Sequence, residues 1–425
     1  MPATGSDQIV VVGLGYVGLP LAVALAKTAS VTGFDIDAKR VEELRAGHDR
    51  TREVGREALK ASSLTLSSDS KACAGADIYI VTVPTPVDAG NKPDLGSVIS
   101  ATRTVATLLD KAKKPIIIYE STVYPGVTED ICGTLIEDLS GLKRGTDFFL
   151  GYSPERINPG DREHTIDRIT KVVAGENEEI TERLAALYGK ITSGGTFRAK
   201  SIKAAEAAKV IENAQRDINI AFMNEITQIF AKLDISVWDV LEAAGTKWNF
   251  LRFQPGLVGG HCIGVDPYYL SHRAQQLGHD PHVILAGRST NDTMGAWVAD
   301  QIHARRPEAG SALVMGLSFK ENVPDLRNSR VIDVIRRLDA LGHEVTVHDP
   351  LVDPAEAVRE YGIQPAADAL ERAYDTVVVA VPHEAYAALG DDQIAAVVAE
   401  GGLLADLKNL YAGRQLPSGI DRWSF

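Results

Sequence analysis

Short apolar runs separated by a glycine-rich turn open the chain. Residues 9–12 form a β-branched run, the GxGxxG turn follows at 13–18, an alanine-rich apolar segment covers 19–29, and a second run covers 31–34. Short, continuous apolar runs are typical of strands that a parallel sheet buries on both faces. The order strand, turn, helix, strand predicts the first unit of an α/β fold.

The same pattern continues along the first third of the chain. Residues 76–84, 115–120 and 148–152 are further apolar runs that predict buried strands. A doubly wound sheet binds its ligand beside the carboxyl ends of its strands. Polar residues that follow such ends are therefore candidates for a site, and they are Thr85, Thr122 and Glu155.

The last third of the chain repeats this pattern weakly. Residues 312–316 resemble 9–13, residues 345–349 resemble 31–35, and residues 375–382 resemble 77–84, with a further run at 402–406. A repeat of this kind predicts a second Rossmann-like sheet. The glycine fingerprint is missing from the second copy, so we expect it to bind no second dinucleotide. Lys320 and Arg327 suit a different phosphorylated ligand.

A helical segment lies between the two repeats. Residues 199–233 contain few helix breakers, and a helix of ~35 residues would span about 50 Å. The fold class we expect is α/β, with two Rossmann-like doubly wound domains joined by a long central helix. The expected domains are 1–198 for the first sheet, 199–305 for the helical region with a cysteine loop, and 306–425 for the second sheet. A helix of this length often packs against a partner subunit.

Composition narrows the classes of protein. Lys and Arg total 44 and Asp and Glu total 57 among 425 residues, so a basic nucleic-acid footprint is excluded as a bulk feature. No apolar run approaches the ~18 residues of a membrane span, and residues 1–8 lack the pattern of a signal peptide. Three cysteines, Cys73, Cys132 and Cys262, predict a reducing, cytoplasmic setting rather than a disulfide scaffold.

The first turn has the chemistry of a dinucleotide site. Gly13 permits a tight turn, Gly15 allows a pyrophosphate to approach the backbone, and Gly18 allows the helix to pack against the strand. Asp35 follows Gly15 by 20 residues, at the end of the second strand. Its carboxylate would accept from the ribose hydroxyls and repel a 2′-phosphate, which favours NAD over NADP.

Two further segments carry candidate chemistry. Lys209, Asn213 and Arg216 share one face of the long helix; such stripes are usually solvated, but apolar residues flank this one. Residues 255–267 hold four glycines within nine positions, which indicates unusual backbone geometry. Cys262 in this loop is a candidate nucleophile, although most lone cysteines are small buried apolar residues. No paired Cys/His spacing predicts a metal.

Seven segments together resemble one family, the UDP-glucose/UDP-mannose dehydrogenase superfamily. They lie between residues 9 and 330, and the form of the last two is most similar to the UDP-N-acetylhexosamine branch. The segments are VVGLGYVGLPLA, VTVPTPVD, ESTVYPG, GYSPERINPGD, EAAKVIENAQRDINIAFMNE, PGLVGGHCIGVDPYYL and GLSFKENVPDLRNS.

The resemblance implies a four-electron, NAD-dependent oxidation of the C6 hydroxyl of UDP-N-acetylglucosamine or UDP-N-acetylgalactosamine, for surface polysaccharide such as capsule. Cys262 matches the nucleophile that forms a thiohemiacetal and then a thioester. Lys209 and Asn213 match the pair that stabilises charge on oxygen. Asp266 matches the carboxylate that assists proton transfer with Thr122 and a water, and Glu155 matches the base for thioester hydrolysis.

The resemblance also implies binding residues and a partner. Arg252 matches a residue that reaches the substrate of a neighbouring subunit, so a homodimer or higher oligomer is expected. Arg40 is expected to cover the adenine side. The cofactor set is Gly13, Gly15, Tyr16, Val17, Gly18, Asp35, Arg40, Val83, Thr85, Thr122, Glu155 and Arg327. The substrate set, within the second sheet's domain and the helical region, is Lys209, Asn213, Lys247, Asn249, Leu251, Arg252, Gly259 and Lys320.

Alternatives remain open at this point. The epimer at C2 or C4 is not encoded by a short motif, so UDP-glucose and UDP-N-acetylmannosamine stay alternatives. A two-electron dehydrogenase of the 6-phosphogluconate or hydroxyacid kind would need neither Cys262 nor a second α/β domain. A catalytically silent sensor of nucleotide sugars would be expected to have lost one of these residues, and none is lost. Neither a nucleic acid nor a membrane is expected as a partner.

Overall fold

The computed structural model describes residues 7–88, 90–156, 165–260 and 263–425, and the chain divides into two compact units. The first unit comprises Met1–Glu212 with Tyr268–His279, and the second comprises Asn213–Pro267 with Asp280–Phe425. Each unit contains its own sheet, as the sequence repeat predicted. The division into three domains at residues 198 and 305 stays a prediction.

Among the described residues, the first unit forms a sheet in the order β3-β2-β1-β4-β5-β6-β7-β8. Its strands run parallel except for β6 and β7, which are antiparallel. All five strands predicted in this part of the chain are confirmed. The strands are β1 Gln8–Val12, β2 Ser30–Phe34, β3 Thr65–Ser67, β4 Ile78–Val81, β5 Ile116–Tyr119, β6 Phe149–Tyr152, β7 Lys171–Gly175 and β8 Thr196–Arg198.

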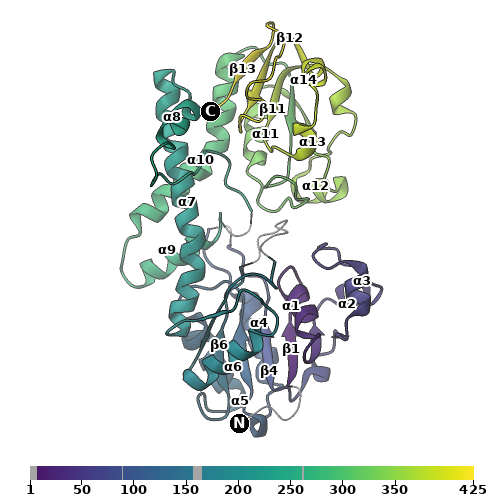
Figure 1. Cartoon of the computed structure of the whole chain (residues 1–425), viewed down its shortest axis with the longest axis vertical. Coiled ribbons are helices and arrows are strands. Elements are labelled where there is room, and N and C mark those ends of the chain that lie inside the picture. The colour runs from purple at the N-terminus through teal and green to yellow at the C-terminus, as the bar shows by residue number, and fades with distance from the viewer. Residues whose placement is uncertain (1–6, 89, 157–164, 261–262) are drawn as a thin grey trace. The chain divides into compact units, whose positions relative to one another are not determined.

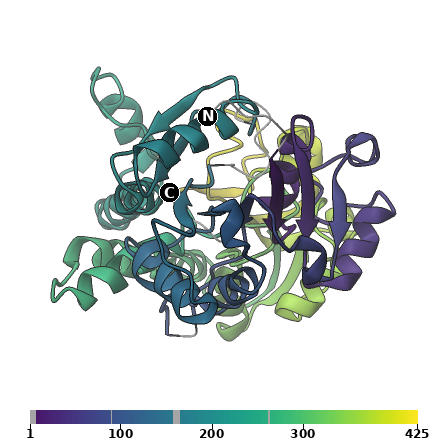
Figure 2. The ribbon, with the colours of Figure 1, turned by 90° about the horizontal axis from the view of Figure 1, so that it is seen from below.

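Helices cover this sheet because its central strands are apolar on both faces. Every residue of β4 (IYIV) and β5 (IIIY) is buried. In Figures 1 and 2, α2 and α3 lie at the edge of the unit, and α2 packs beside β3. The helices are α1 Gly18–Leu25, α2 Ala38–Arg45, α3 Arg56–Ala61, α4 Gly96–Ala106, α5 Thr134–Ser140 and α6 Glu178–Tyr188, with the short 3₁₀ helices η1 Ser70–Cys73 and η2 Lys111–Lys113 and the π-helix η3 Val127–Gly133.

The described part of the second unit contains a parallel sheet in the order β10-β9-β11-β12-β13. The four predicted strands are confirmed, whereas β13 was not predicted. The strands are β9 Ser311–Met315, β10 Glu344–His348, β11 Tyr374–Val379, β12 Val398–Asp406 and β13 Asp421–Trp423. The other described elements between residues 237 and 397 are α8 Val237–Ala244, α9 Asp266–Gln276, α10 His282–Arg305, α11 Val331–Ala340, α12 Pro354–Tyr361, η4 Ala369–Glu371, α13 Glu384–Ala387 and α14 Asp391–Val397. Of these, α9 belongs to the first unit from Tyr268 onward.

The predicted long helix is α7, an unbroken helix of 32 residues over Ile202–Leu233 (Figure 1). Its first turns are fastened to the first unit by Glu206, which is fully buried. The Glu206 carboxylate accepts the backbone N–H groups of Gly126 (2.6 Å) and Thr128 (2.9 Å), at the start of η3. Within the described residues, no helix combines the length and hydropathy needed to cross a membrane.

Burial gives Glu206 an unusual titration, because burial raises its pKa to about 7 despite the two N–H donors. The native state therefore holds this proton at pH values where the unfolded chain, with a pKa near 4.5, has lost it. The sign follows from linkage: Glu206 makes the native state less stable as pH rises from about 4.5 to 7.

We expect the free energy of unfolding of the wild type, relative to Glu206→Gln, to fall by roughly 3 kcal/mol at most between pH 5 and pH 8. Urea unfolding of both proteins at the two pH values measures this difference. Glu212→Gln, an exposed position on the same helix, is the control. A difference that stays constant or grows with pH would contradict the assignment.

Candidate active site

The glycine turn between β1 and α1 has the shape that a pyrophosphate needs. Gly13 has φ +93°, a conformation that L side chains rarely adopt. A Cβ on Gly18 would lie 1.8 Å from the Gly13 carbonyl oxygen, so this position requires glycine for close packing. At Gly15 a Cβ would meet no atom within 4 Å, so the backbone there is open to a ligand. Tyr16 and Val17 complete the turn and are half-buried.

The peptide groups of Leu14 are held from both sides. Asp35 Oδ2 accepts from the Leu14 N–H at 2.8 Å, while the guanidinium of Arg40 donates to the Leu14 carbonyl at 2.9 and 3.0 Å. Arg40 is 3% exposed and forms an ion pair with Asp49 at 2.7 Å. In the structure, Arg40 therefore holds the glycine turn in place. Its contact with adenine stays a prediction.

Asp35 keeps the capacity to bind a ribose. Its carboxylate is half-buried, and its oxygens accept from Leu14 and from the Asp37 N–H (2.9 Å). A carboxylate has about four acceptor positions, so capacity remains for ribose hydroxyls. The residues of this turn thus fit NAD.

Side chains at the ends of β4, β5 and β6 fasten one strand end to the next. The Ser121 hydroxyl donates to the Val83 carbonyl at 2.6 Å, and the Tyr152 hydroxyl donates to the Ser121 carbonyl at 3.2 Å. Thr122 is half-buried directly after Ser121, and Glu155 is 8% exposed after β6. The predicted residues Val83, Thr85, Thr122 and Glu155 therefore all lie at the carboxyl edge of one sheet.

The long helix carries the next two predicted residues. Lys209 is 7% exposed and lies one turn before Asn213 on α7. The Asn213 amide donates to Asp266 Oδ2 at 2.5 Å, and Asp266 is 2% exposed at the start of α9. Two residues that are 53 positions apart in the sequence are thus in direct contact. A carboxylate bonded to an amide in this way can take up a proton while the amide stays oriented.

Asparagines hold the glycine loop of the second unit. The Asn224 side chain pairs with both backbone groups of Gly256, at 2.8 and 3.0 Å. The side-chain amide of Asn328 donates to the Gly260 carbonyl (3.0 Å), and the backbone carbonyl of Asn328 accepts from the Gly260 N–H (3.3 Å). A Cβ on Gly259 would lie 2.6 Å from the Asn328 oxygen. Cys262, the predicted nucleophile, lies outside the described residues.

The other two cysteines lie in environments that do not suit a nucleophile. Cys73 and Cys132 are both buried, and burial raises the pKa of each thiol to about 11. A thiol is nucleophilic as its thiolate, which these two sites disfavour. This agrees with the interpretation of both as small core residues.

The second sheet repeats the local geometry of the first. Gly316 has φ +94°, and Asp349 accepts from the Leu317 N–H at 2.7 Å, as Asp35 accepts from Leu14. Asp349 is buried, however, and also accepts from the Ser318 N–H and from His383 Nε2. Burial alone would raise the pKa of Asp349, but these hydrogen bonds outweigh it and hold the pKa at about 2.

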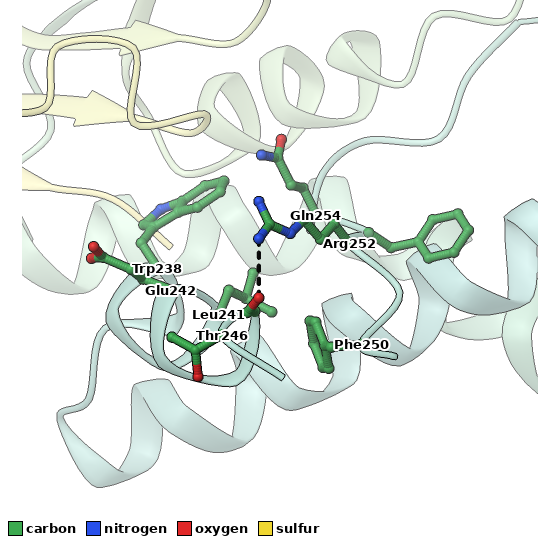
Figure 3. Close-up of a pocket in the computed structure, with 9 residues that line it drawn as sticks. Trp238, Leu241, Glu242, Thr246, Phe250, Arg252 and Gln254 are labelled. Atoms are coloured by element: carbon green, nitrogen blue, oxygen red, sulfur yellow. Dashed lines mark hydrogen bonds between the residues drawn. The ribbon is translucent and has the colours of Figure 1, made fainter. Parts of the chain in front are cut away.

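The remaining predicted substrate residues lie in the second unit. Lys320 is half-buried, while Arg327, which was predicted for the cofactor set, forms an ion pair with Asp325 at 2.6 Å. Arg252 is exposed and donates to the Gly245 carbonyl at 3.0 Å, beside a pocket of about 410 Å³ that Trp238 and Phe250 also line (Figure 3). The other predicted residues of the preceding loop, Lys247, Asn249 and Leu251, are exposed.

Sequence reasoning missed the residues that position the site. One missed residue is Asp49, the ion-pair partner of Arg40. Its side chain also accepts from the backbone N–H groups of Thr51, Glu53 and Val54. Glu206 could have been found from its position three residues before Lys209. The two asparagines, Asn224 and Asn328, carry no signal in a single sequence, because the loop groups that they bond are backbone atoms of distant residues.

Comparison with known proteins agrees with this geometry. Residues 7–192, 203–293 and 313–413 match the NAD binding, central and UDP binding domains of the UDP-glucose/GDP-mannose dehydrogenase family. The chain is 50% identical to the UDP-N-acetyl-D-glucosamine 6-dehydrogenase of Pseudomonas aeruginosa, over 95% of this chain and 97% of the relative. It is 46% identical to the enzyme of the same name from Salmonella typhi, over 96% and 97%.

A solved structure shares the fold over nearly the whole chain. The UDP-D-ManNAc dehydrogenase of Pyrococcus horikoshii superposes with a TM-score of 0.86, at 28% identity, covering 98% of both chains. With three consecutive domain matches, the resemblance inferred from the seven segments is confirmed. The chain belongs to the UDP-glucose/GDP-mannose dehydrogenase family.

Proposed function

We propose that this chain oxidises the C6 hydroxyl of a UDP-N-acetylhexosamine, UDP-N-acetylglucosamine or UDP-N-acetylgalactosamine, to a carboxylate for surface polysaccharide. The observation that carries the proposal is the 50% identity, over 95% of this chain, to an enzyme named for UDP-N-acetyl-D-glucosamine. Enzymes named for UDP-N-acetyl-D-mannosamine are only 30% to 33% identical. The gluco epimer is therefore the favoured substrate, in a cytoplasmic enzyme.

The first oxidation uses a proton acceptor and oxygen-directed donors. When bound, NAD accepts one hydride from C6 in each of the two oxidations. Asp266, with Thr122 and a water, takes the hydroxyl proton as the alcohol becomes an aldehyde. Lys209 and Asn213 donate hydrogen bonds to the sugar oxygen and stabilise its developing negative charge. The contact between Asn213 and Asp266 supports this pairing of roles.

The second oxidation needs a covalent bond to the protein. The thiol of Cys262 adds to the aldehyde carbon, which gives a thiohemiacetal that can lose a second hydride. The product is a thioester, and Glu155 serves as the base for the water that hydrolyses it. In sum, one alcohol, two NAD⁺ and one water become one carboxylate, two NADH and three protons.

The stoichiometry of NADH to sugar tests this function. With limiting UDP-N-acetylglucosamine, -galactosamine or -mannosamine, and UDP-glucose for contrast, we expect two NADH per sugar with one N-acetylated epimer. Cys262→Ser removes the nucleophile and is expected to abolish acid formation. One NADH per sugar would favour the two-electron dehydrogenase, and no NADH with any sugar would favour the silent sensor.

Cofactor preference tests the role of Asp35. Its carboxylate would face the 2′-phosphate of NADP, so we expect kcat/KM to favour NAD by about two orders of magnitude. Asp35→Asn should narrow this preference because the negative charge is gone. Asp37→Asn is the matched control, since Asp37 is two residues away and exposed. Equal kcat/KM values for both cofactors in the wild type would refute the assignment.

The proposed enzyme is a homodimer or a higher homo-oligomer. Phe222, Ile229 and Leu233 are 56%, 48% and 60% exposed, and their spacing places them within about 40° of one another around α7. An apolar stripe of this kind is typical of a surface that a partner covers. In the second unit, Trp248 and Leu251 add exposed apolar area beside Arg252 (90% and 62% exposed).

Sedimentation velocity of a stripe variant tests this assembly. We expect Phe222→Glu to shift the wild-type oligomer towards monomer and to lower activity, because Arg252 would no longer reach a neighbouring substrate. Lys232→Glu changes the charge of another exposed face of α7 and should leave the assembly intact. A wild type that is monomeric and fully active would remove the role of Arg252 across subunits.

A further inference from the structure

A buried ion pair lies directly beneath two of the strand ends that carry candidate catalytic residues. Glu120 follows β5, and Lys171 is the first residue of β7. Lys171 Nζ lies 2.5 Å from Glu120 Oε2, and the two side chains are 2% and 0% exposed. The Tyr188 hydroxyl donates to the other carboxylate oxygen, and its ring centroid lies 5.2 Å from Lys171 Nζ. The cluster therefore has both signs of charge and is closed to solvent.

Each member of the pair is adjacent to a predicted catalytic segment. Lys171 Nζ also donates to the Pro154 carbonyl at 3.2 Å, and Pro154 directly precedes Glu155. Glu120 directly precedes Ser121 and Thr122. The ion pair thus connects the backbone on both sides of the site, at the ends of β5 and β6.

Stability alone gives a weak reason for such a pair. Removing two charges from water costs several kcal/mol for each ion, and apolar side chains of similar volume are often as stable. The neighbouring strand positions in β5 are apolar and fully buried, so an apolar pair would suit this environment. This buried pair also bonds the Pro154 carbonyl, directly before Glu155. The pair is therefore better explained by the position that it imposes on Glu155.

The charges of the cluster are coupled to Glu155. Burial raises the pKa of the Glu120 carboxyl, the ammonium of Lys171 opposes this rise, and the charge of Glu155 adds to it. The Glu120 carboxyl is therefore influenced both by the ammonium of Lys171 and by the charge of Glu155. Loss of Lys171 would remove the ammonium that offsets the burial of Glu120.

We propose that Lys171, paired with Glu120, is a positioning residue that fixes the Pro154–Glu155 peptide for thioester hydrolysis. This inference rests on the proposed function. In the step concerned, Glu155 takes a proton from water as the water oxygen bonds to the acyl carbon. The carbon–sulfur bond breaks, the sulfur keeps its electron pair, and the proton passes to the sulfur of Cys262. The carboxylic acid then releases the remaining proton of the water to solvent, which gives the carboxylate. No electrons are transferred in this step.

Rapid mixing of enzyme, NAD and UDP-N-acetylglucosamine separates this step from the two oxidations. If hydrolysis alone is slowed, about two NADH per active site form in a burst, and a slow steady state follows. We expect this pattern for Lys171→Met and for the charge-neutral Glu120→Gln/Lys171→Met, with steady-state rates lowered roughly 10- to 100-fold. The KM for NAD should change less than about twofold, since the glycine turn is untouched.

Two reference variants make the pattern specific. Glu155→Gln removes the base itself and should show the same burst, with an acyl adduct on the enzyme detected by intact-mass spectrometry. Tyr79→Phe is the matched control, since Tyr79 is another buried tyrosine of this unit, whose hydroxyl donates to the Cys73 and Leu108 carbonyls. It should show no burst.

The outcome that overturns the inference is a folded double variant with wild-type turnover, or one in which the first NADH is slowed as much as the steady state. If both Lys171 variants fail to fold, Tyr188→Phe carries the test, because it keeps both charges and removes one donor to Glu120. A burst of NADH followed by a steady-state rate lowered about threefold supports the inference. A burst and a steady-state rate that both equal those of the wild type overturn it.

Failure of the proposed function would be seen in the wild type. One NADH per sugar, or no acyl adduct in Glu155→Gln, would remove the thioester step itself. Two NADH per sugar and an adduct in Glu155→Gln, with no burst in the Lys171 variants, would overturn only the role of Lys171.

Discussion

Backbone carbonyls at the ends of parallel strands need hydrogen-bond donors, and this requirement shapes the site. Where a strand stops, the ladder no longer supplies a partner, and a buried carbonyl without one is costly. In the first unit side chains supply these donors: Thr82 to Val12 and Gly13, Ser121 to Val83, Arg40 to Leu14, and Lys171 to Pro154. The loops that would hold the cofactor are consequently fastened by hydrogen bonds from side chains of neighbouring elements.

The two sheets show how burial decides what one geometry can do. Asp35 and Asp349 occupy equivalent positions, each accepting the N–H group of the residue after a glycine with positive φ. Asp35 is half-buried and retains acceptor capacity, whereas Asp349 is buried and also bonded to Ser318 and His383. His383 Nδ1 accepts from the Asn322 N–H, so Nε2 carries the proton that it donates to Asp349. Asp349 therefore holds its own loop in place.

Most of the fold could be predicted from sequence because parallel sheets leave a strong signal. Strands buried on both faces read as continuous apolar runs, and nine such runs matched strands of the two sheets. The strands that were missed, β3, β7, β8 and β13, are short or polar edge strands, or begin with a charged residue as β7 does with Lys171. In a sequence, a lysine at the start of a strand predicts an exposed position. Only the tertiary structure shows that Lys171 is buried with Glu120 as its partner.

The candidate site divides along the same line. Asp266, Lys209 and Asn213 could be named from sequence because the segments that contain them resemble those of a known family. Their supports could not, because a side chain that bonds a distant carbonyl leaves no local pattern. Arg40 illustrates the difference, since its position after Asp35 suggested a ligand contact, while its guanidinium is bonded to the turn itself.

Buried hydrogen-bonded carboxyl groups and ion pairs have a physical advantage over apolar packing at these places. An apolar contact tolerates small displacements. A buried ion pair, or a carboxyl group bonded to two N–H groups, loses stabilising free energy steeply when its distances change. Glu206 fastens the first turns of α7 to η3 in this way, and Glu120 with Lys171 fastens the ends of β5 and β6. Glu206 lies three residues before Lys209, and Glu120 lies two residues before Thr122, while Lys171 bonds the carbonyl of the residue directly before Glu155. These buried polar contacts thus lie where a displacement of less than 1 Å would matter most to chemistry.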